Sequence, residues 1–246
     1  MSAGSKYGFE STTGLTIQQG IFEASADIKH SIGTRMQLAD GRVFYYAKAG
    51  AVALSAGKLN MAALAIAGHE DNPVLADVAV FEKVVTVTPA TAVVTANQYA
   101  EGFLSFRDGP GEGQMRKIKK HPAAGIAAPV EITLYDPLTV ALTATTSEAD
   151  LIKSPYDEVI ESAVEENIPS GVPLIDVTED YYFWNQTFGP ANVLSDGAIA
   201  AGTLVNAGTA AGSVAAQAAF LFPMVGTVML LTGAGEYGAV FLRLAA

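Results

Sequence analysis

Short apolar runs separated by glycine-containing turns are the feature that most constrains what this chain can fold into. Residues 40–59 show the pattern: Asp40-Gly41 signals a tight turn, because glycine tolerates the positive φ that such turns require. An aromatic-rich run and a second run punctuated by glycine follow. Residues 193–205 repeat this order less clearly, with an Asp-Gly pair, an apolar run and then an Ala-Gly pair. The pattern predicts strands joined by turns, with similar hairpins in equivalent corners of one barrel.

The middle of the chain has the densest strand signals. Residues 78–88 are rich in β-branched side chains, and residues 130–135 alternate in polarity. Further short strands are expected at 102–106, 115–120 and 140–143. The glycine-rich residues 109–113 predict a hairpin loop, because a phosphate-binding loop would continue with Lys-Ser or Lys-Thr. Strands of this length and spacing are typical of a small barrel or sandwich.

We therefore predict a mainly β protein with an extended N-terminal arm, residues 1–35, followed by two small β-barrel or β-sandwich modules. The outer module comprises residues 36–74 and 156–246, and residues 75–155 form a second module inserted into it. Residues 61–67 could form a short helix on propensity alone. Residues 157–166 could be an acidic helix or a strand, and the β context favours the strand.

The arm has isolated apolar residues without the period of a helix or a strand. Such a segment cannot build a core of its own, so we expect it to dock on a neighbouring molecule. The contacts would come from Tyr7, Phe9, Leu15, Ile21 and Phe22. Deleting residues 1–35 is then expected to leave both modules folded.

Residues 181–188 contain four consecutive aromatic side chains, including the single tryptophan. Alternation along a strand places Tyr182 and Trp184 on one face, and Tyr181 and Phe183 on the other. Because both faces are apolar, we expect a strand between a core and a subunit contact, with Tyr182 and Trp184 at that contact. The alternative is a platform that stacks against sugars.

Signatures of catalysis and metal binding are weak. The chain has no cysteine, its three histidines are far apart in sequence, and no Gly-x-Ser-x-Gly elbow occurs. The acidic clusters at 161–166 and 176–180 lack the pattern of a calcium loop. We therefore expect no enzyme activity, cofactor or metal. The basic run 116–121 is interpreted as a solvated edge strand, or else as a contact strip for an acidic neighbour.

Charge limits the partners. A net charge of −11 disfavours nucleic acid as the main partner, because phosphate binding depends on Lys and Arg. Residues 198–235 carry no charge, but their glycines and the lack of flanking Lys or Arg favour buried strands over a membrane span. The N-terminal residues show no apolar signal-peptide core.

Three of these segments, 40–59, 181–190 and 193–205, resemble virion proteins of tailed bacteriophages, specifically head decoration (cement) proteins. The resemblance implies a structural protein that binds the major capsid protein on the outside of the shell and associates with itself, most simply as a trimer. It implies location on the virion surface after synthesis in the bacterial host cytoplasm. A sugar- or receptor-binding β module of a virion fibre or cell surface is the alternative.

Overall fold

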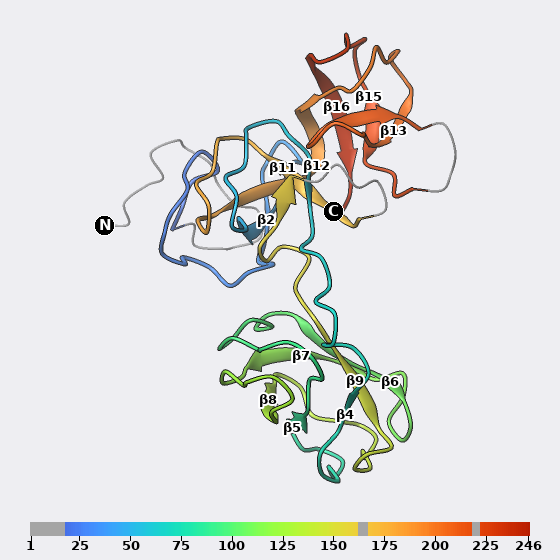
Figure 1. Ribbon diagram of the computed structural model, residues 1–246. Coiled ribbons are helices and arrows are strands. Elements are labelled where there is room, and N and C mark those ends of the chain that lie inside the picture. The colour runs from blue at the N-terminus through green and yellow to red at the C-terminus, as the bar shows by residue number, and fades with distance from the viewer. Residues whose placement is uncertain (1–17, 162–166, 218–221) are drawn as a thin grey trace. The chain divides into compact units, whose positions relative to one another are not determined.

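The computed structural model describes residues 18–161, 167–217 and 222–246 (Figure 1). The chain divides into a flanking unit, Met1–Ala63 with Pro155–Ala246, and an inserted unit, Leu64–Ser154. The insertion begins before residue 75, where the sequence suggested a boundary. The reason is that residues 68 and 69 already bond to the inserted unit: the Gly68 carbonyl accepts from Ala90 N–H at 2.9 Å, and the His69 carbonyl from Leu151 N–H at 3.0 Å.

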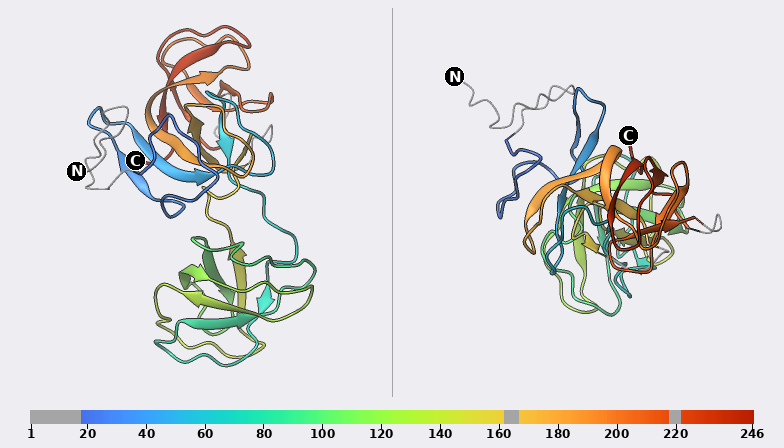
Figure 2. Two further views of the ribbon diagram at one scale, coloured as in Figure 1. Left: turned by 90° about the vertical axis from the view of Figure 1, so that its left-hand side faces the viewer. Right: turned by 90° about the horizontal axis from the view of Figure 1, so that it is seen from above.

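The inserted unit is a small barrel whose strands curl around one core (Figure 2). Its strands are β4 (Asn72–Pro73), β5 (Val84–Val87), β6 (Phe103–Asp108), β7 (Met115–Lys120), β8 (Val130–Leu134) and β9 (Glu148–Ile152). They form an antiparallel sheet in the order β4-β9-β6-β7-β8-β5. A bridge between Val74 and Val87 joins the two ends of that order, so the sheet nearly closes. Near closure leaves little free edge.

Strand β7 therefore pairs on both sides, with β6 and with β8, and the edge-strand interpretation of residues 116–121 is wrong. Ile118 is fully buried, whereas Lys117 and Lys119 lie over the ring of Tyr135. Charged side chains on alternate residues show which face of a strand meets water, and they do not show whether its edge is paired.

The flanking unit contains the remaining strands. They are β1 (Arg35–Gln37), β2 (Val43–Lys48), β3 (Asn60–Met61), β10 (Ile160–Glu161), β11 (Pro169–Pro173), β12 (Tyr182–Leu194), β13 (Leu204–Ala207), β14 (Val214–Ala216), β15 (Gly226–Val228) and β16 (Tyr237–Arg243). Strand β12 pairs with β2 through its first half and with β16 through its second half. Separate cores form along these halves. The expected hairpin at Asp40-Gly41 is confirmed, because it joins β1 to β2.

Both faces of the first half of β12 are buried within the flanking unit. Trp184 packs with Tyr46 and Tyr182 in one cluster, and Phe183 packs with Val177 in another. The predicted alternation along the strand is therefore confirmed, and the chain itself covers each face.

Residues 18–35 belong to the flanking unit, so the prediction of a separable arm is wrong for this part of 1–35. Ile21 is only 2% exposed and lies in the Trp184 cluster. The Gln19 side chain donates to the Tyr182 carbonyl at 2.8 Å and accepts from the Tyr46 hydroxyl at 2.7 Å. The Gln19 carbonyl accepts from Trp184 Nε1 at 2.8 Å. Residues 1–17 lie outside the described residues.

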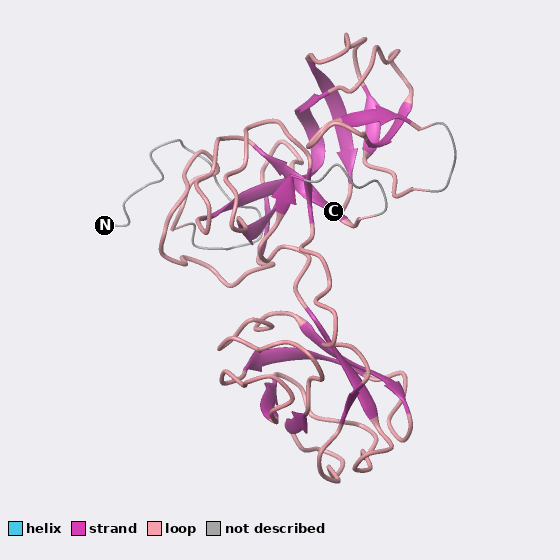
Figure 3. Cartoon of the chain, in the orientation of Figure 1, coloured by secondary structure: helices cyan, strands magenta, loops and turns pink. Residues whose placement is uncertain are grey.

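All regular elements in the described ranges are strands, and the mainly β prediction is confirmed (Figure 3). The helix considered for residues 61–67 does not form: Met61 ends β3, which pairs with β11, and irregular chain follows. The segment 157–166, expected to be a helix or a strand, contains strand β10 at Ile160–Glu161. Its residues 162–166 lie outside the described residues. No helix in the described part of the chain is long and apolar enough to cross a membrane.

Two expected strands and the expected second hairpin differ from the structure. Only Val84–Val87 of residues 78–88 is a strand, because residues 79–82 form a turn. Residues 140–143 contribute only a bridge at Leu142. Residues 193–205 do not form a hairpin, since β12 and β13 are not paired with each other.

Candidate interaction surfaces

One local structure recurs in four bridged pairs, eight copies in all, among the described residues, and we call each paired copy a turn unit. Each turn unit begins at a residue that makes an isolated β-bridge and reaches a residue with positive φ three positions later. The bridge residues are Leu54, Val78, Val94, Ala124, Leu142, Val177, Ile199 and Thr232. The matching positive-φ residues are Gly57, Phe81, Asn97, Ala127, Thr145, Asp180, Gly202 and Gly235.

The turn units occur in antiparallel pairs. The bridges join Leu54 to Val177, Val78 to Leu142, Val94 to Ala124 and Ile199 to Thr232. Each pair exchanges two backbone hydrogen bonds of 2.8–3.1 Å. In the Val78–Leu142 pair, the Phe81 N–H donates to the Leu138 carbonyl and the Thr145 N–H donates to the Val74 carbonyl, both at 2.9 Å. These bonds are made by the main chain, so they do not depend on which side chain occupies the positive-φ position.

The positive-φ position favours glycine, asparagine and aspartate, because other side chains clash with the backbone there. Five of the eight residues belong to these types, Ala127 is small, and Thr145 is β-branched and therefore also disfavoured in this conformation. Phe81 differs from all of them: its φ is +73° and it is 78% exposed. A bulky aromatic residue in this conformation is a genuine outlier.

The surroundings of Phe81 combine apolar and acidic side chains. Val80 is 38% exposed and Val140 is 49% exposed, and the antiparallel Val78–Leu142 bridge brings their segments together. The exposed acids are Asp77, Glu82 and Asp136, and the exposed base is Lys83, whose Nζ donates to the Tyr135 carbonyl at 2.7 Å. We call Val80, Phe81 and Val140 with these three acids the Phe81 surface.

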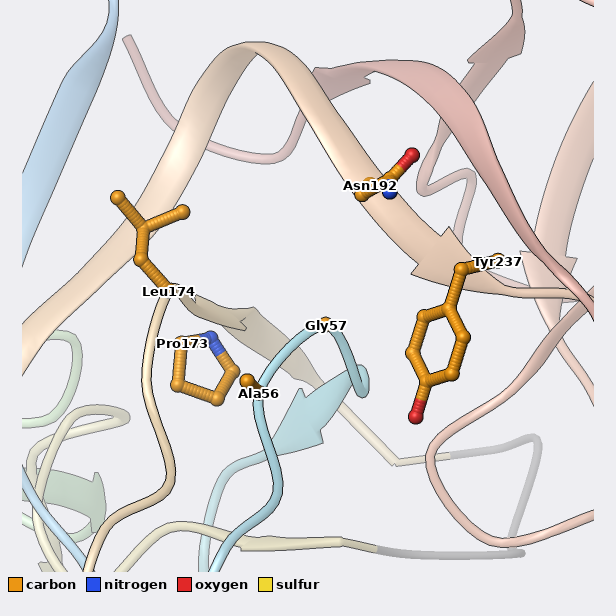
Figure 4. A pocket seen from close by; sticks show the side chains of 6 residues that line it. All are labelled: Ala56, Gly57, Pro173, Leu174, Asn192 and Tyr237. Atoms are coloured by element: carbon orange, nitrogen blue, oxygen red, sulfur yellow. The ribbon is translucent and has the colours of Figure 1, made fainter.

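The flanking unit has a shallow hollow of about 310 Å³ (Figure 4). It is lined by Ala56, Gly57, Pro173, Leu174, Asn192 and Tyr237. A Cβ added to Gly57 would lie 2.8 Å from the Tyr237 ring, so glycine is needed there for close packing as well as for its φ of +74°. The lining has one aromatic ring and one amide, and no charged side chain. Such a hollow can hold an apolar or aromatic group, but it offers no acid or base for catalysis.

The histidines have structural contacts. His69 and His121 are buried on either side of Tyr99: His69 bonds to its hydroxyl, and Nε2 of His121 accepts its backbone N–H at 3.0 Å. His30 packs against the rings of Tyr46 and Trp184. Within residues 18–161, 167–217 and 222–246, no group of three His, Cys, Asp or Glu side chains is arranged to hold a metal ion.

The contact residues expected from the sequence divide into three classes. Tyr7, Phe9 and Leu15 lie outside the described residues. Ile21 and Trp184 are core residues, 2% and 1% exposed, so neither side chain can contact a partner molecule while the unit is folded. The same burial excludes a sugar platform on Trp184. Phe22 is 41% exposed, and Tyr182 is half-buried against Tyr46, so these two retain accessible surface.

Comparisons with known proteins give no relative for this chain. No protein-family model matches it, and neither curated proteins nor solved structures include a significant match.

Proposed function

We propose that the protein is a structural component of a tailed-phage virion that binds the outside of the capsid shell and stabilises it as a decoration protein. The resemblance of residues 40–59, 181–190 and 193–205 to such proteins supports this function. Two units that each have their own core also suit it, because one chain can then contact a lattice at more than one place.

Exposed apolar side chains on the turn units are the observation that carries the proposal. Turns of a free-standing protein are normally polar, yet large apolar residues lie within three positions of these bridges and are 38–78% exposed. They are Val52, Leu75, Val80, Phe81, Val93, Ile126, Val140, Met229, Leu230 and Leu231. Only 16% of the residues are charged, which also favours a surface that an assembly covers in part.

Sedimentation with shells tests this function. Purified protein would be mixed with shells assembled from the major capsid protein of the phage that encodes the chain. We expect saturable co-sedimentation and a higher temperature of shell disruption. Shells already saturated with the protein serve as the control for non-specific pelleting. Absence of binding, or about a dozen or fewer copies per virion by quantitative mass spectrometry, would contradict a lattice-wide role.

The hollow at Tyr237 favours a second candidate, a sugar- or receptor-binding β module. Tyr237 is 48% exposed and Asn192 places an amide beside it, which gives an apolar surface with one orienting polar group. This candidate predicts that the isolated protein binds glycans and that Tyr237→Ala abolishes the binding with the fold retained. A decoration protein would show no such affinity.

A further inference from the structure

We infer that the Phe81 surface is the contact by which the inserted unit binds its partner. The partner is a pocket of the shell protein that is apolar inside and rimmed by Lys or Arg. This inference rests on the proposed decoration function and identifies the residue that anchors it.

The other turn units serve as an internal control for what the fold requires at this position. Seven of eight positive-φ residues are glycine, asparagine, aspartate, alanine or threonine. The pairing and its backbone hydrogen bonds form with each of these side chains. The turn at Phe81 would therefore form with glycine, asparagine or aspartate, and each of these would relieve the strain of positive φ. The fold gives no reason for phenylalanine here.

The Phe81 ring also contributes little to packing within the described chain. At 78% exposure it lies outside the core cluster of the inserted unit. The turn is held by main-chain bonds: Phe81 N–H donates to the Leu138 carbonyl, and Leu138 N–H donates to the Glu82 carbonyl, both at 2.9 Å. A strained residue whose large apolar side chain has no structural use is the type that marks a binding position.

Charge indicates what covers the ring. The acids Asp77, Glu82 and Asp136 outnumber the bases on and beside these segments, which are Lys83 and Arg116. The Arg116 guanidinium donates to the Pro137 carbonyl at 2.9 Å and to the Thr139 hydroxyl at 2.8 Å. The remaining charge is negative, so a complementary partner presents cations at the rim of its pocket. A second copy of this chain fits less well, because two chains of net charge −11 repel one another on approach. Exposed aromatic anchors that fill a pocket are typical of the residues that dominate binding energy.

The test compares two variants that relieve the same backbone strain in one pair of turn units, Phe81→Asn and Thr145→Asn. Thr145 is also exposed and has φ of +62°, but its side chain is polar. Binding to shells would be measured by sedimentation over a range of protein and salt concentrations, and stability by thermal unfolding. Phe81→Gly is a second variant, in case asparagine disturbs the turn.

We expect both asparagine variants to keep or raise the melting temperature, by up to about 2–4 °C. Phe81→Asn should weaken shell binding by about 30-fold or more, as loss of a hot-spot residue does, and Thr145→Asn should bind as the unmodified protein does. Glu82→Lys should weaken binding most at low salt, because it places a cation against the cationic rim.

Four outcomes would overturn the inference. If the unmodified protein binds shells and Phe81→Asn and Phe81→Gly bind within twofold of it, the contact lies elsewhere while the decoration function stands. If both Phe81 variants melt at lower temperature, the fold uses the ring. If they abolish self-association in sedimentation equilibrium and leave shell binding unchanged, the occupant is a second copy. Failure of the unmodified protein to bind shells rejects the decoration function itself, and the inference with it.

Discussion

Ile21 and Phe22 are adjacent apolar residues for which the structure predicts opposite results. Ile21 is 2% exposed and packs with Met36, Phe44 and Trp184, whereas Phe22 is 41% exposed. Ile21→Ala removes three buried carbon atoms, worth about 2.4 kcal/mol at ~0.8 kcal/mol per methylene, and the cavity raises the total to about 3 kcal/mol. Phe22→Ala should change the free energy of unfolding by about 1 kcal/mol or less, because much of the ring is already in water.

Denaturant unfolding followed by tryptophan fluorescence measures this difference directly. Trp184 is the only tryptophan and lies in the same cluster as Ile21, so its emission reports on the flanking unit alone. A loss of about 3 kcal/mol should lower the melting temperature of that unit by about 6–12 °C. Equal effects of the two substitutions, or a change below about 0.5 kcal/mol for Ile21→Ala, would show that residues 18–24 are a separable arm after all.

Further predictions concern glycine and pH. Gly57→Ala should destabilise the protein more than Gly202→Ala, as urea unfolding would show, because both residues have positive φ but only the Cβ at 57 would meet a ring, at 2.8 Å. A hydrogen bond to Glu101, with burial, raises the pKa of Tyr135 to about 12, so its contribution to stability is complete below pH 10 and lost between pH 10 and about 12. Tyr135→Phe should flatten calorimetric stability in that window. Burial lowers the pKa of His121, so its contribution is complete above pH 6.5 and lost as pH falls below it; His121→Gln should reduce that acid loss.

Local signals in the sequence predicted several of the strands and one turn. The expected strand 115–120 coincides with β7, and the Asp40-Gly41 turn joins two strands as expected. Alternation along 181–188 separates Trp184 from Phe183 as predicted. These features depend on neighbours in sequence, since turn chemistry and the two-residue period of a strand are local properties.

Long-range contacts account for what the sequence did not show. The Gln19 side chain bonds to the Tyr182 carbonyl across 163 positions, and nothing near residue 19 indicates that partner. The central position of β7 likewise depends on pairing with β6 and β8. A polar residue such as Gln19 is read as solvated unless the buried hydroxyl and indole that it satisfies are known.

The similarity between residues 40–59 and 193–205 comes from two of the turn units, and not from the Asp-Gly turns on which the prediction of similar hairpins relied. Leu54-Ser-Ala-Gly-Lys-Leu59 matches Ile199-Ala-Ala-Gly-Thr-Leu204 when the two are aligned on Gly57 and Gly202, whereas the Asp-Gly turns at 40 and 196 are not equivalent. Because main-chain bonds hold each turn unit, its sequence requirement reduces to a bridge residue and, three positions later, a residue that tolerates positive φ. Because many different sequences meet this requirement, a turn unit is hard to recognise in a single sequence. Phe81 departs from this requirement, and the contact proposed above accounts for its large exposed ring.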